Sequence, residues 1–252
     1  SRACAKFKRG AGMAAQQGII PYKSEGGKYV PSPFDGNSWW TGGFWPGIMW
    51  QLYKATGEEV YKDEALRTEE LLTRELMTFD LLNHDVGFMY LLSCGAHYRL
   101  TGDAKARTNT LHAATLLAGR FNPAGFIRAW PGEDRTGYAI IDCMMNLSLL
   151  YWATEQTKDP RFAAIAKIHA DTTLREFLRE DGSSCHIVIF DPNTGKALDR
   201  PGGQGYAPGS SWSRGQAWAL YGFTLSGINP GETRYFDAAR RCARHWERKK
   251  NM

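Results

Sequence analysis

Apolar residues along the chain gather in paired segments joined by short polar turns. In each pair, an apolar segment that ends in an aromatic residue runs into a turn, and a second segment follows. Four such pairs succeed one another: 44–53 with 60–76, 88–98 with 104–121, 140–152 with 162–178, and 217–223 with 235–246. Apolar residues in the second members recur every three or four positions, as on a helix with one solvated face. The pattern predicts four helical hairpins, preceded by a helical segment at 2–17.

The first member of each hairpin is apolar almost all round, most clearly at 140–152. Such a helix is packed on both sides. Gly, Asp and Pro in the turns supply stops and starts for the helices. Alternating inner and outer helices with short turns predict an all-α toroid or barrel, although a stacked solenoid has the same periodicity. For the third hairpin we expect the inner helix to begin near Thr136 and Gly137.

Polar and aromatic residues precede or open the inner helices. They occupy segments 39–47, 83–89, 141–142 and 210–218. In a closed ring of inner helices that run in one direction, the N-terminal ends gather at one mouth. Concave mouths of this kind are where ligands bind. Residues far apart in the sequence are therefore expected to converge on one pocket.

Composition agrees with one soluble globular domain over residues 1–252, since 43% of the residues are hydrophobic and 23% are charged. Nine tryptophans are an unusual share. Sugar-binding clefts use many indoles, so the count favours a carbohydrate site. The net charge of +5 comes largely from residues 240–250, where a solvated helix face explains it. We expect no nucleic-acid partner.

The five cysteines, at positions 4, 94, 143, 185 and 242, have no metal-like spacing. An odd set of cysteines inside apolar patterns is typical of a reducing compartment, so we expect a cytoplasmic protein, with the periplasm as the alternative. The first residues lack the apolar region of a signal peptide, and no apolar run reaches 18 residues. We therefore expect no membrane segment.

Two acidic residues stand out as candidates for chemistry. Asp142 follows two isoleucines in an apolar segment, where burial would raise the pKa of its carboxyl, as a general acid near neutral pH requires. Asp85 lies beside His84 in a turn-like segment, where we expect better hydration and an ionised carboxylate. Two carboxyls with different environments divide the acid and base roles. A helix N-cap would equally explain Asp85, and His84 is either a site residue or a surface turn residue.

Other candidate sites are weaker. His186 lies on a short strand-like stretch, where a hydrogen-bonded histidine is as good an explanation as a ligand-binding one. The His and Cys residues lack the spacing of metal ligands, so we expect no metal. The loop at 202–205 is rich in glycine, but no GK[ST] follows it, so it does not predict a phosphate site. No nucleophile-elbow pattern is present.

Four ordered motifs together carry a resemblance. They are Trp40-Thr41-Gly42-Gly43-Phe44-Trp45-Pro46-Gly47, His84-Asp85-Val86-Gly87-Phe88-Met89, Ile141-Asp142-Cys143-Met144-Met145-Asn146-Leu147 and Ser211-Trp212-Ser213-Arg214-Gly215-Gln216-Ala217-Trp218. Over roughly residues 35–225 the chain resembles the unsaturated glucuronyl hydrolases, glycoside hydrolase family 88. The resemblance implies an (α/α)6 barrel of helical hairpins, no cofactor, and oligosaccharide substrates that end in a 4,5-unsaturated uronic acid.

The same resemblance assigns roles to individual residues. Asp142 corresponds to the general acid/base and Asp85 to the second essential carboxylate. The implied substrate-binding residues are Trp40, His84, Trp130, His186, Gln204, Trp212, Arg214, Gln216 and Trp218. The mechanism it implies is hydration of the C4=C5 vinyl ether rather than direct displacement at C1.

Only four hairpins are present where the family has six, so we expect a barrel that is incomplete at the C-terminus. A second copy of the chain could then cover the open barrel, which makes a homo-oligomer a candidate assembly. Two alternative functions stay open. One is an unsaturated rhamnogalacturonyl hydrolase of family 105, and the other is a non-catalytic barrel fragment that binds saccharide or only self-associates.

Overall fold

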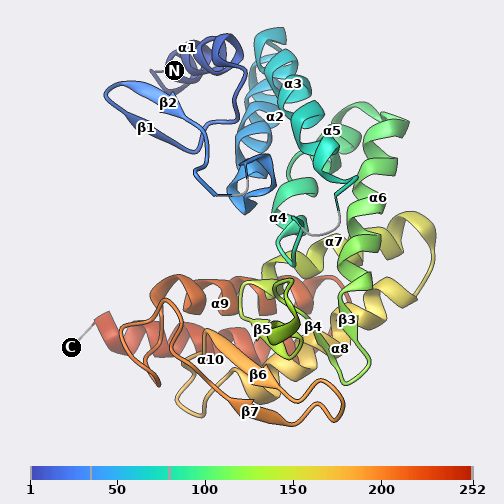
Figure 1. Ribbon diagram of the computed structural model, residues 1–252, viewed down its shortest axis with the longest axis vertical. Helices are drawn as coiled ribbons and strands as arrows, with labels where there is room; N and C mark the ends of the chain where they lie inside the picture. Colours follow the sequence, from blue (N-terminus) through green and yellow to red (C-terminus); the bar gives the residue numbers. More distant parts are fainter. Residues whose placement is uncertain (1, 35, 79–80, 251–252) are drawn as a thin grey trace. The chain divides into compact units, whose positions relative to one another are not determined.

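The computed structural model describes residues 2–34, 36–78 and 81–250, which form mainly α-helices with three small antiparallel sheets (Figure 1). The chain divides into two compact units. The first is Ser1–Leu82 with Val86–Ala113, and the second is Asn83–Asp85 with Ala114–Met252. The short segment Asn83–Asp85 is thus the one part before residue 114 that belongs to the second unit. A single catalytic domain over residues 1–252 stays a prediction.

The first unit contains helix α1 (Arg2–Gln17), the hairpin of β1 (Lys23–Glu25) and β2 (Lys28–Val30), and the 3-10 turns η1 (Gly36–Ser38) and η2 (Trp40–Gly43). Helices α2 (Phe44–Thr56), α3 (Glu59–Glu75), α4 (Val86–Tyr90) and α5 (Cys94–Thr101) follow. Helices α2 and α3 form a hairpin, and α1 packs against α3. Helix α6 (Ala104–Gly119) begins in this unit and ends in the second.

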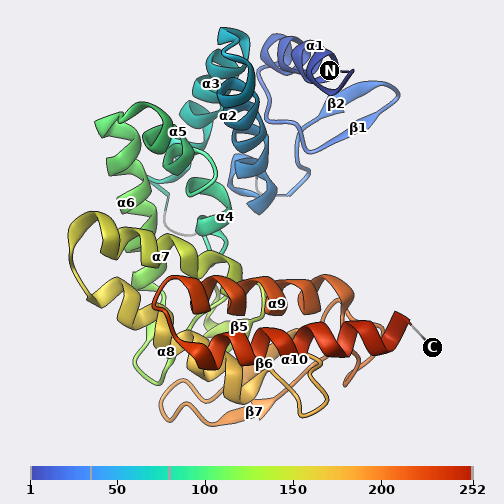
Figure 2. The same cartoon turned by 180° about the vertical axis from the view of Figure 1, so that it is seen from behind.

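The second unit opens with the β3 (Phe121–Asn122) and β4 (Phe126–Ile127) pair and the 3-10 turn η3 (Glu133–Arg135). Strands β5 (Tyr138–Ile140), β6 (Ile187–Phe190) and β7 (Ala197–Asp199) form a sheet in that order. Two helical hairpins complete it: α7 (Cys143–Thr157) with α8 (Arg161–Glu176), and α9 (Ser213–Ile228) with α10 (Thr233–Lys250). Helices α9 and α10 lie side by side in both views (Figure 1, Figure 2).

The predicted helical hairpins are confirmed, with two corrections. The segment 88–98 is not one helix, because α4 ends at Tyr90 and α5 begins at Cys94. Between them the buried Ser93 leaves helical geometry, with φ −95° and ψ −95°, and its hydroxyl donates to the carbonyl of Met89. Such bonding of a serine hydroxyl to the backbone competes with regular helix geometry. In the part of the chain that the structure describes, no helix is long and apolar enough to cross a membrane.

The second correction concerns the third inner helix, which begins at Cys143 and not near Thr136 and Gly137. Residues Tyr138–Ile140 pair instead with the strand that begins at Ile187. Gly137 allows the two backbones to approach, because a Cβ at this position would lie 1.9 Å from the carbonyl oxygen of Phe190. Asp142 therefore lies at the junction between a strand and a helix.

Two buried tryptophan–glutamate hydrogen bonds join α2 to α3. The indole of Trp45 donates to Glu64 over 2.7 Å, and that of Trp50 donates to Glu69 over 2.5 Å. The second oxygen of Glu69 lies 3.0 Å from Nδ1 of His97, and the His97 ring stacks on Trp50. A buried carboxylate needs such donors to offset its desolvation. These bonds fix the angle at which the first hairpin packs.

We predict that Glu69→Gln lowers the free energy of unfolding by about 2 to 3 kcal/mol, because one buried donor loses a charged acceptor. Glu70→Gln is the matched control. Its carboxylate is exposed and pairs with Arg74 on the same helix, so it should cost less than about 0.5 kcal/mol. Urea unfolding measures both. Equal losses in the two variants would contradict the importance of the buried bonds.

Candidate active site

Asp142 is positioned by the end of β5 and the start of α7. It directly precedes the helix, with φ −57° and ψ −29°, and its side chain makes no capping hydrogen bond. The N–H of Ile141 donates to the carbonyl of His186 over 3.0 Å, which continues the β5–β6 pairing up to Asp142. The strand pairing therefore brings Asp142 next to His186, and the carboxyl is not used to cap the helix.

Asp85 is fixed beside a fully buried His84. Nδ1 of His84 lies 3.0 Å from the carbonyl oxygen of Ala129, and Nε2 lies 3.1 Å from Oδ1 of Asp85. A carbonyl only accepts, so Nδ1 carries a proton. A second proton, on Nε2, would give the ring a positive charge that attracts the carboxylate of Asp85. Burial lowers the pKa of His84, but Asp85 and Asp142 more than offset this, and the net shift is upward.

Two expectations about this segment are wrong. His84 is not a surface turn residue, because no part of it is exposed. Asp85 is also not better hydrated than Asp142, since the exposed fractions of their side chains are 13% and 15%. The two carboxyl groups differ in their donors instead. Oδ1 of Asp85 faces His84 and an amide group, whereas Oδ2 of Asp142 has no hydrogen-bond partner among the described residues.

The pKa of Asp142 is raised to about 6. Burial is the largest cause, and the negative charge of Asp85 is the second, while His84 and Arg214 act in the opposite direction. A carboxyl with this pKa is protonated in an appreciable fraction of molecules near neutral pH, so it can both donate and accept a proton. The burial predicted from the apolar sequence around Asp142 is therefore present.

Asn146 joins the two carboxyl-bearing residues and was missed as a site residue in the sequence. It is fully buried on α7, and Nδ2 donates to Oδ1 of Asp85 over 3.3 Å and to the carbonyl of Asp142 over 3.1 Å. The signal in the sequence was an amide one helical turn after Asp142 inside an apolar helix. A buried amide needs partners, and that alone marks the position.

His186 lies on the other side of Asp142. Its Nε2 is 3.7 Å from Oδ2 of Asp142, and its Nδ1 accepts a hydrogen bond from the backbone N–H of Gln204 over 2.9 Å. Burial, together with Arg214 and His84, lowers the pKa of His186 to about 4. His186 is therefore neutral, with its proton on Nε2 and directed toward Asp142. Gly203 permits this approach, because a Cβ there would overlap the His186 ring.

Three further predicted site residues lie in a chain of contacts that starts at His186. The rings of His186 and Trp212 lie 4.4 Å apart, and the guanidinium of Arg214 lies 4.4 Å from the centre of the Trp212 ring. Nη2 of Arg214 donates to Oε1 of Gln204 over 2.9 Å. Arg214 and Gln204 are exposed. The structure thus brings an aromatic surface and an accessible cation close to Asp142.

The tryptophans predicted to bind substrate have different surroundings. Trp130 meets His84 edge to face at 6.2 Å, so it lies beside the carboxylate pair. Trp218 is half-buried on α9. Trp40 belongs to the first unit, where it packs against Phe44 and Phe88. Contact of these residues with a substrate stays a prediction.

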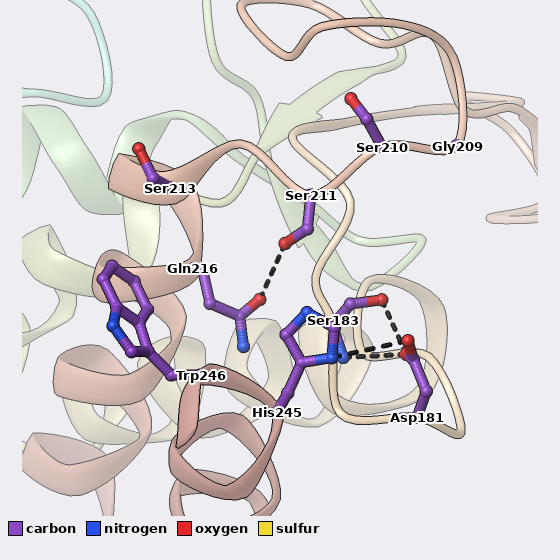
Figure 3. Close-up of a pocket in the computed structure, with 9 residues that line it drawn as sticks. All are labelled: Asp181, Ser183, Gly209, Ser210, Ser211, Ser213, Gln216, His245 and Trp246. Carbon is purple, nitrogen blue, oxygen red and sulfur yellow. Dashed lines mark hydrogen bonds and ion pairs between the residues drawn. The ribbon is translucent and has the colours of Figure 1, made fainter. Parts of the chain in front are cut away.

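Gln216 lines a separate cavity of about 570 Å³ between the start of α9 and the end of α10 (Figure 3). Its Oε1 accepts hydrogen bonds from the backbone N–H of Ser184 and the hydroxyl of Ser211, and its Nε2 donates to the carbonyl of Gly182. Asp181 and His245 form an ion pair at 3.4 Å in the same cavity. These bonds give Gln216 a structural role, and a substrate contact of its side chain stays a prediction.

The site combines the carboxyl of Asp142, whose pKa is raised to about 6, with the carboxyl of Asp85, whose Oδ1 faces His84 and Asn146. Such a pair can transfer a proton and stabilise a developing positive charge. Among the described residues, no group of three His, Cys, Asp or Glu side chains is arranged to hold a metal ion. This pair of carboxyl groups on a helical-hairpin fold is therefore the candidate active site.

Comparison with known proteins identifies the family. The model of "Glycosyl Hydrolase Family 88" matches residues 21–226, and the chain belongs to this family. It is 42% identical to the unsaturated glucuronyl hydrolase of Bacillus sp. (strain GL1) over 233 residues, which are 90% of this chain and 61% of that protein. It is 41% identical to the unsaturated chondroitin disaccharide hydrolase of Streptococcus agalactiae over 197 residues, 75% of this chain and 49% of that one.

Solved structures agree with this assignment. The unsaturated glucuronyl hydrolase from Bacillus sp. GL1 matches with a TM-score of 0.86 and 39% identity, over 94% of this chain and 64% of that one. A heparin-specific unsaturated glucuronyl hydrolase matches with a TM-score of 0.82 and 33% identity, over 94% and 66%. The predicted (α/α)6 class of fold is thereby confirmed, and the chain spans less than two thirds of the length of these relatives. The family model that matches is that of family 88, the first of the two families considered from the sequence.

We predict that Asp142→Asn makes the folded chain more stable at pH 7 by about 2 to 3 kcal/mol. The native state holds the Asp142 proton up to about pH 6, whereas the ordinary pKa of this carboxyl is 3.8. Between these values the native state binds more protons than the unfolded state, so stability falls as pH rises through this window. Asparagine has no such proton to lose.

Urea unfolding at pH 4 and pH 7 checks this prediction, because the advantage of Asp142→Asn should vanish near pH 4. Asp134→Asn is the control, since the side chain of Asp134 is 80% exposed and its stability difference should not depend on pH. Equal stability of Asp142→Asn and the parent chain at pH 7 would contradict the raised pKa.

Proposed function

We propose that this chain carries the catalytic carboxyl groups of a hydrolase that removes a terminal 4,5-unsaturated uronic acid from oligosaccharides released by polysaccharide lyases. The observation that carries the proposal is the pKa of Asp142, raised to about 6 beside Asp85. The names of the relatives support the substrate class, because they specify unsaturated glucuronyl and unsaturated chondroitin compounds. The preferred parent polysaccharide is left to experiment.

The first step is protonation of the substrate's vinyl ether. Asp142 in its neutral form donates its proton to C4, and the C4=C5 double bond becomes a single bond. The positive charge that develops is shared between C5 and the ring oxygen. The carboxylate of Asp85, whose Oδ1 accepts from Asn146 and lies 3.1 Å from Nε2 of His84, stabilises this charge in the low-dielectric surroundings.

Water completes the reaction. Its oxygen bonds to C5, and the Asp142 carboxylate accepts the proton that water releases, so the acid is regenerated. The product at C5 is a hemiketal, which opens by breaking the bond between C5 and the ring oxygen. The hemiacetal left at C1 then releases the aglycone as an alcohol. One water is consumed overall, and the carboxylate spacing that distinguishes retaining from inverting glycosidases does not apply.

His186 and Arg214 have supporting roles in this scheme. Neutral His186 offers its Nε2–H to the carboxylate that Asp142 becomes after donating its proton. Exposed Arg214 is a suitable partner for the substrate's carboxylate, because guanidinium and carboxylate form paired hydrogen bonds. The Trp212 ring beside it offers an apolar face on which a sugar ring can stack.

A second candidate function is binding without catalysis. In this alternative the helical hairpins bind saccharide without turning it over, or only self-associate with a second copy. Saccharide binding without loss of the double bond would favour it. Comparing unsaturated disaccharides from chondroitin and from rhamnogalacturonan would test the substrate class, with the chondroitin product expected to be preferred.

We predict that kcat falls about tenfold per pH unit above pH 6, because Asp142 must be protonated.

Asp142→Asn should lower kcat by at least roughly 1000-fold at every pH, consistent with the loss of the essential proton carrier. The decay of the ultraviolet absorbance of an unsaturated chondroitin disaccharide measures turnover. Full activity of Asp142→Asn would refute the mechanism, and Asp134→Asn is again the control.

We predict that Arg214→Gln raises KM by roughly 10- to 100-fold and changes kcat little, since it removes one charged hydrogen-bonding partner of the bound substrate. Arg200→Gln is a matched exposed control, because its guanidinium pairs with Glu176. The same absorbance assay over a range of substrate concentrations separates the two constants. A fall in kcat at unchanged KM would instead assign Arg214 to the transition state.

A further inference from the structure

Asn146 is a fully buried polar side chain in an otherwise apolar stretch of α7. It is followed by Leu147 and preceded by two methionines, and none of its surface is exposed. Burying an unpaired amide costs free energy, so a buried amide is expected to have specific partners. An apolar residue would fill the same volume without this requirement. The partners of Asn146 therefore explain why an amide is present.

Its Nδ2 donates in two directions. One hydrogen bond reaches the carbonyl of Asp142, one helical turn earlier, and the other reaches Oδ1 of Asp85. The first bond fixes the amide to the start of α7, and the second fixes Asp85 to the amide. We propose that Asn146 is a positioning residue, which holds the ionised carboxylate of Asp85 at a set distance and orientation from Asp142. This inference rests on the function proposed above.

The chemistry of the side chain suits this role. Asn146 supplies a donor without a charge, so it stabilises the carboxylate of Asp85 while leaving Asp85's negative charge to act on Asp142. An aspartate of the same shape would place a third carboxyl beside the pair. A leucine would remove the amide's hydrogen bond and leave Oδ1 of Asp85 facing Nε2 of His84 at 3.1 Å. The amide is thus the choice that keeps the two carboxyl groups different.

Other titratable groups lie close to Asp85 and Asp142, and each of them can affect the pH profile of kcat. Those that act on Asp142 or Asp85 through their charge or a short contact are His84, Arg120, Cys143, His186 and Arg214. None of them lies on the side chain that is changed in the test. A shift caused by removal of the amide is therefore measured against a constant background of charged groups.

The test compares Asn146→Leu and Asn146→Asp in the 252-residue chain with an unsaturated chondroitin disaccharide as the probe. Asn146→Leu should lower kcat by about 10- to 100-fold, the effect of one lost hydrogen bond to a charged group, and leave KM within about threefold. Its pH profile should shift, because Asp85, whose charge raises the pKa of Asp142, is no longer held at a fixed position beside it. Asn146→Asp should lose more activity at pH 7 than Asn146→Leu.

Tyr151→Phe is the matched structural control. Tyr151 lies on the same helix, and its hydroxyl donates to Ser226 in a buried hydrogen bond, so its removal costs stability without touching the carboxyl groups. Its pH profile should match that of the parent chain. If Tyr151→Phe and Asn146→Leu lower kcat equally and neither shifts the profile, Asn146 is only structural and the proposal is overturned.

A titration that needs no turnover separates this inference from the proposed function. Carboxyl carbon NMR of the chain follows the titration midpoint of Asp142 in the parent and in Asn146→Leu. The midpoint should move from about 6 in the variant, because Asp85, whose charge raises the pKa of Asp142, is no longer held by the amide. If the parent shows no turnover but the midpoint moves, the proposed function fails and the positioning role stands. An unchanged midpoint overturns the role of Asn146.

Discussion

The site depends on two neighbouring carboxyl groups that have different polar contacts inside one largely buried region. Burial alone raises the pKa of any carboxyl, and two carboxylates of like charge raise it further. The polar contacts of the two groups differ. Oδ1 of Asp85 accepts a hydrogen bond from Asn146 and lies 3.1 Å from Nε2 of His84, whereas Oδ2 of Asp142 has no hydrogen-bond partner among the described residues. With burial and the charge of Asp85 acting on it, the pKa of Asp142 is raised to about 6.

The small sheet of the second unit makes this arrangement possible within a helical fold. Strand β5 delivers Asp142 to the start of α7, and its partner β6 begins directly after His186. One strand pairing therefore brings a proton donor and a neutral imidazole together. Ala129 contributes through its carbonyl oxygen, which accepts from His84 and also from Arg120. Hence backbone groups of short strands and loops, more than helix packing, set the orientation of the reactive side chains.

Much of the fold followed from the sequence because the helical period is repeated over long segments. The outer helices were predicted within a few residues, and helix α1 was predicted at its observed bounds. The start of α7 was predicted wrongly, because a strand of three residues beside an apolar helix is too short to show a periodic pattern of apolar residues. Such a strand is defined by its partner, which lies nearly fifty residues further along the chain, as the Ile140 and Ile187 pair illustrates.

The site was predicted less completely than the fold, again because it depends on contacts between residues that lie far apart in the sequence. The acidic residues were found because charge in an apolar segment is rare, and His186, Gln204, Trp212 and Arg214 do lie in one chain of contacts. The hydration of Asp85 was predicted wrongly, because a turn-like sequence does not reveal that Asn146, sixty-one residues further along the chain, lies against its carboxylate. Asn146 was missed because its importance lies in two contacts and not in its neighbours.

The charged groups that shift the pKa of Asp142 are Asp85, His84 and Arg214, which all lie in the second unit and within the segment 21–226 that matches the family. The electrostatics of Asp142 therefore depend on contacts that are local to that unit. Electrostatic effects of this kind fall off steeply with distance and with exposure to water. The raised pKa of Asp142 is set by its burial and by the charged groups in its immediate surroundings.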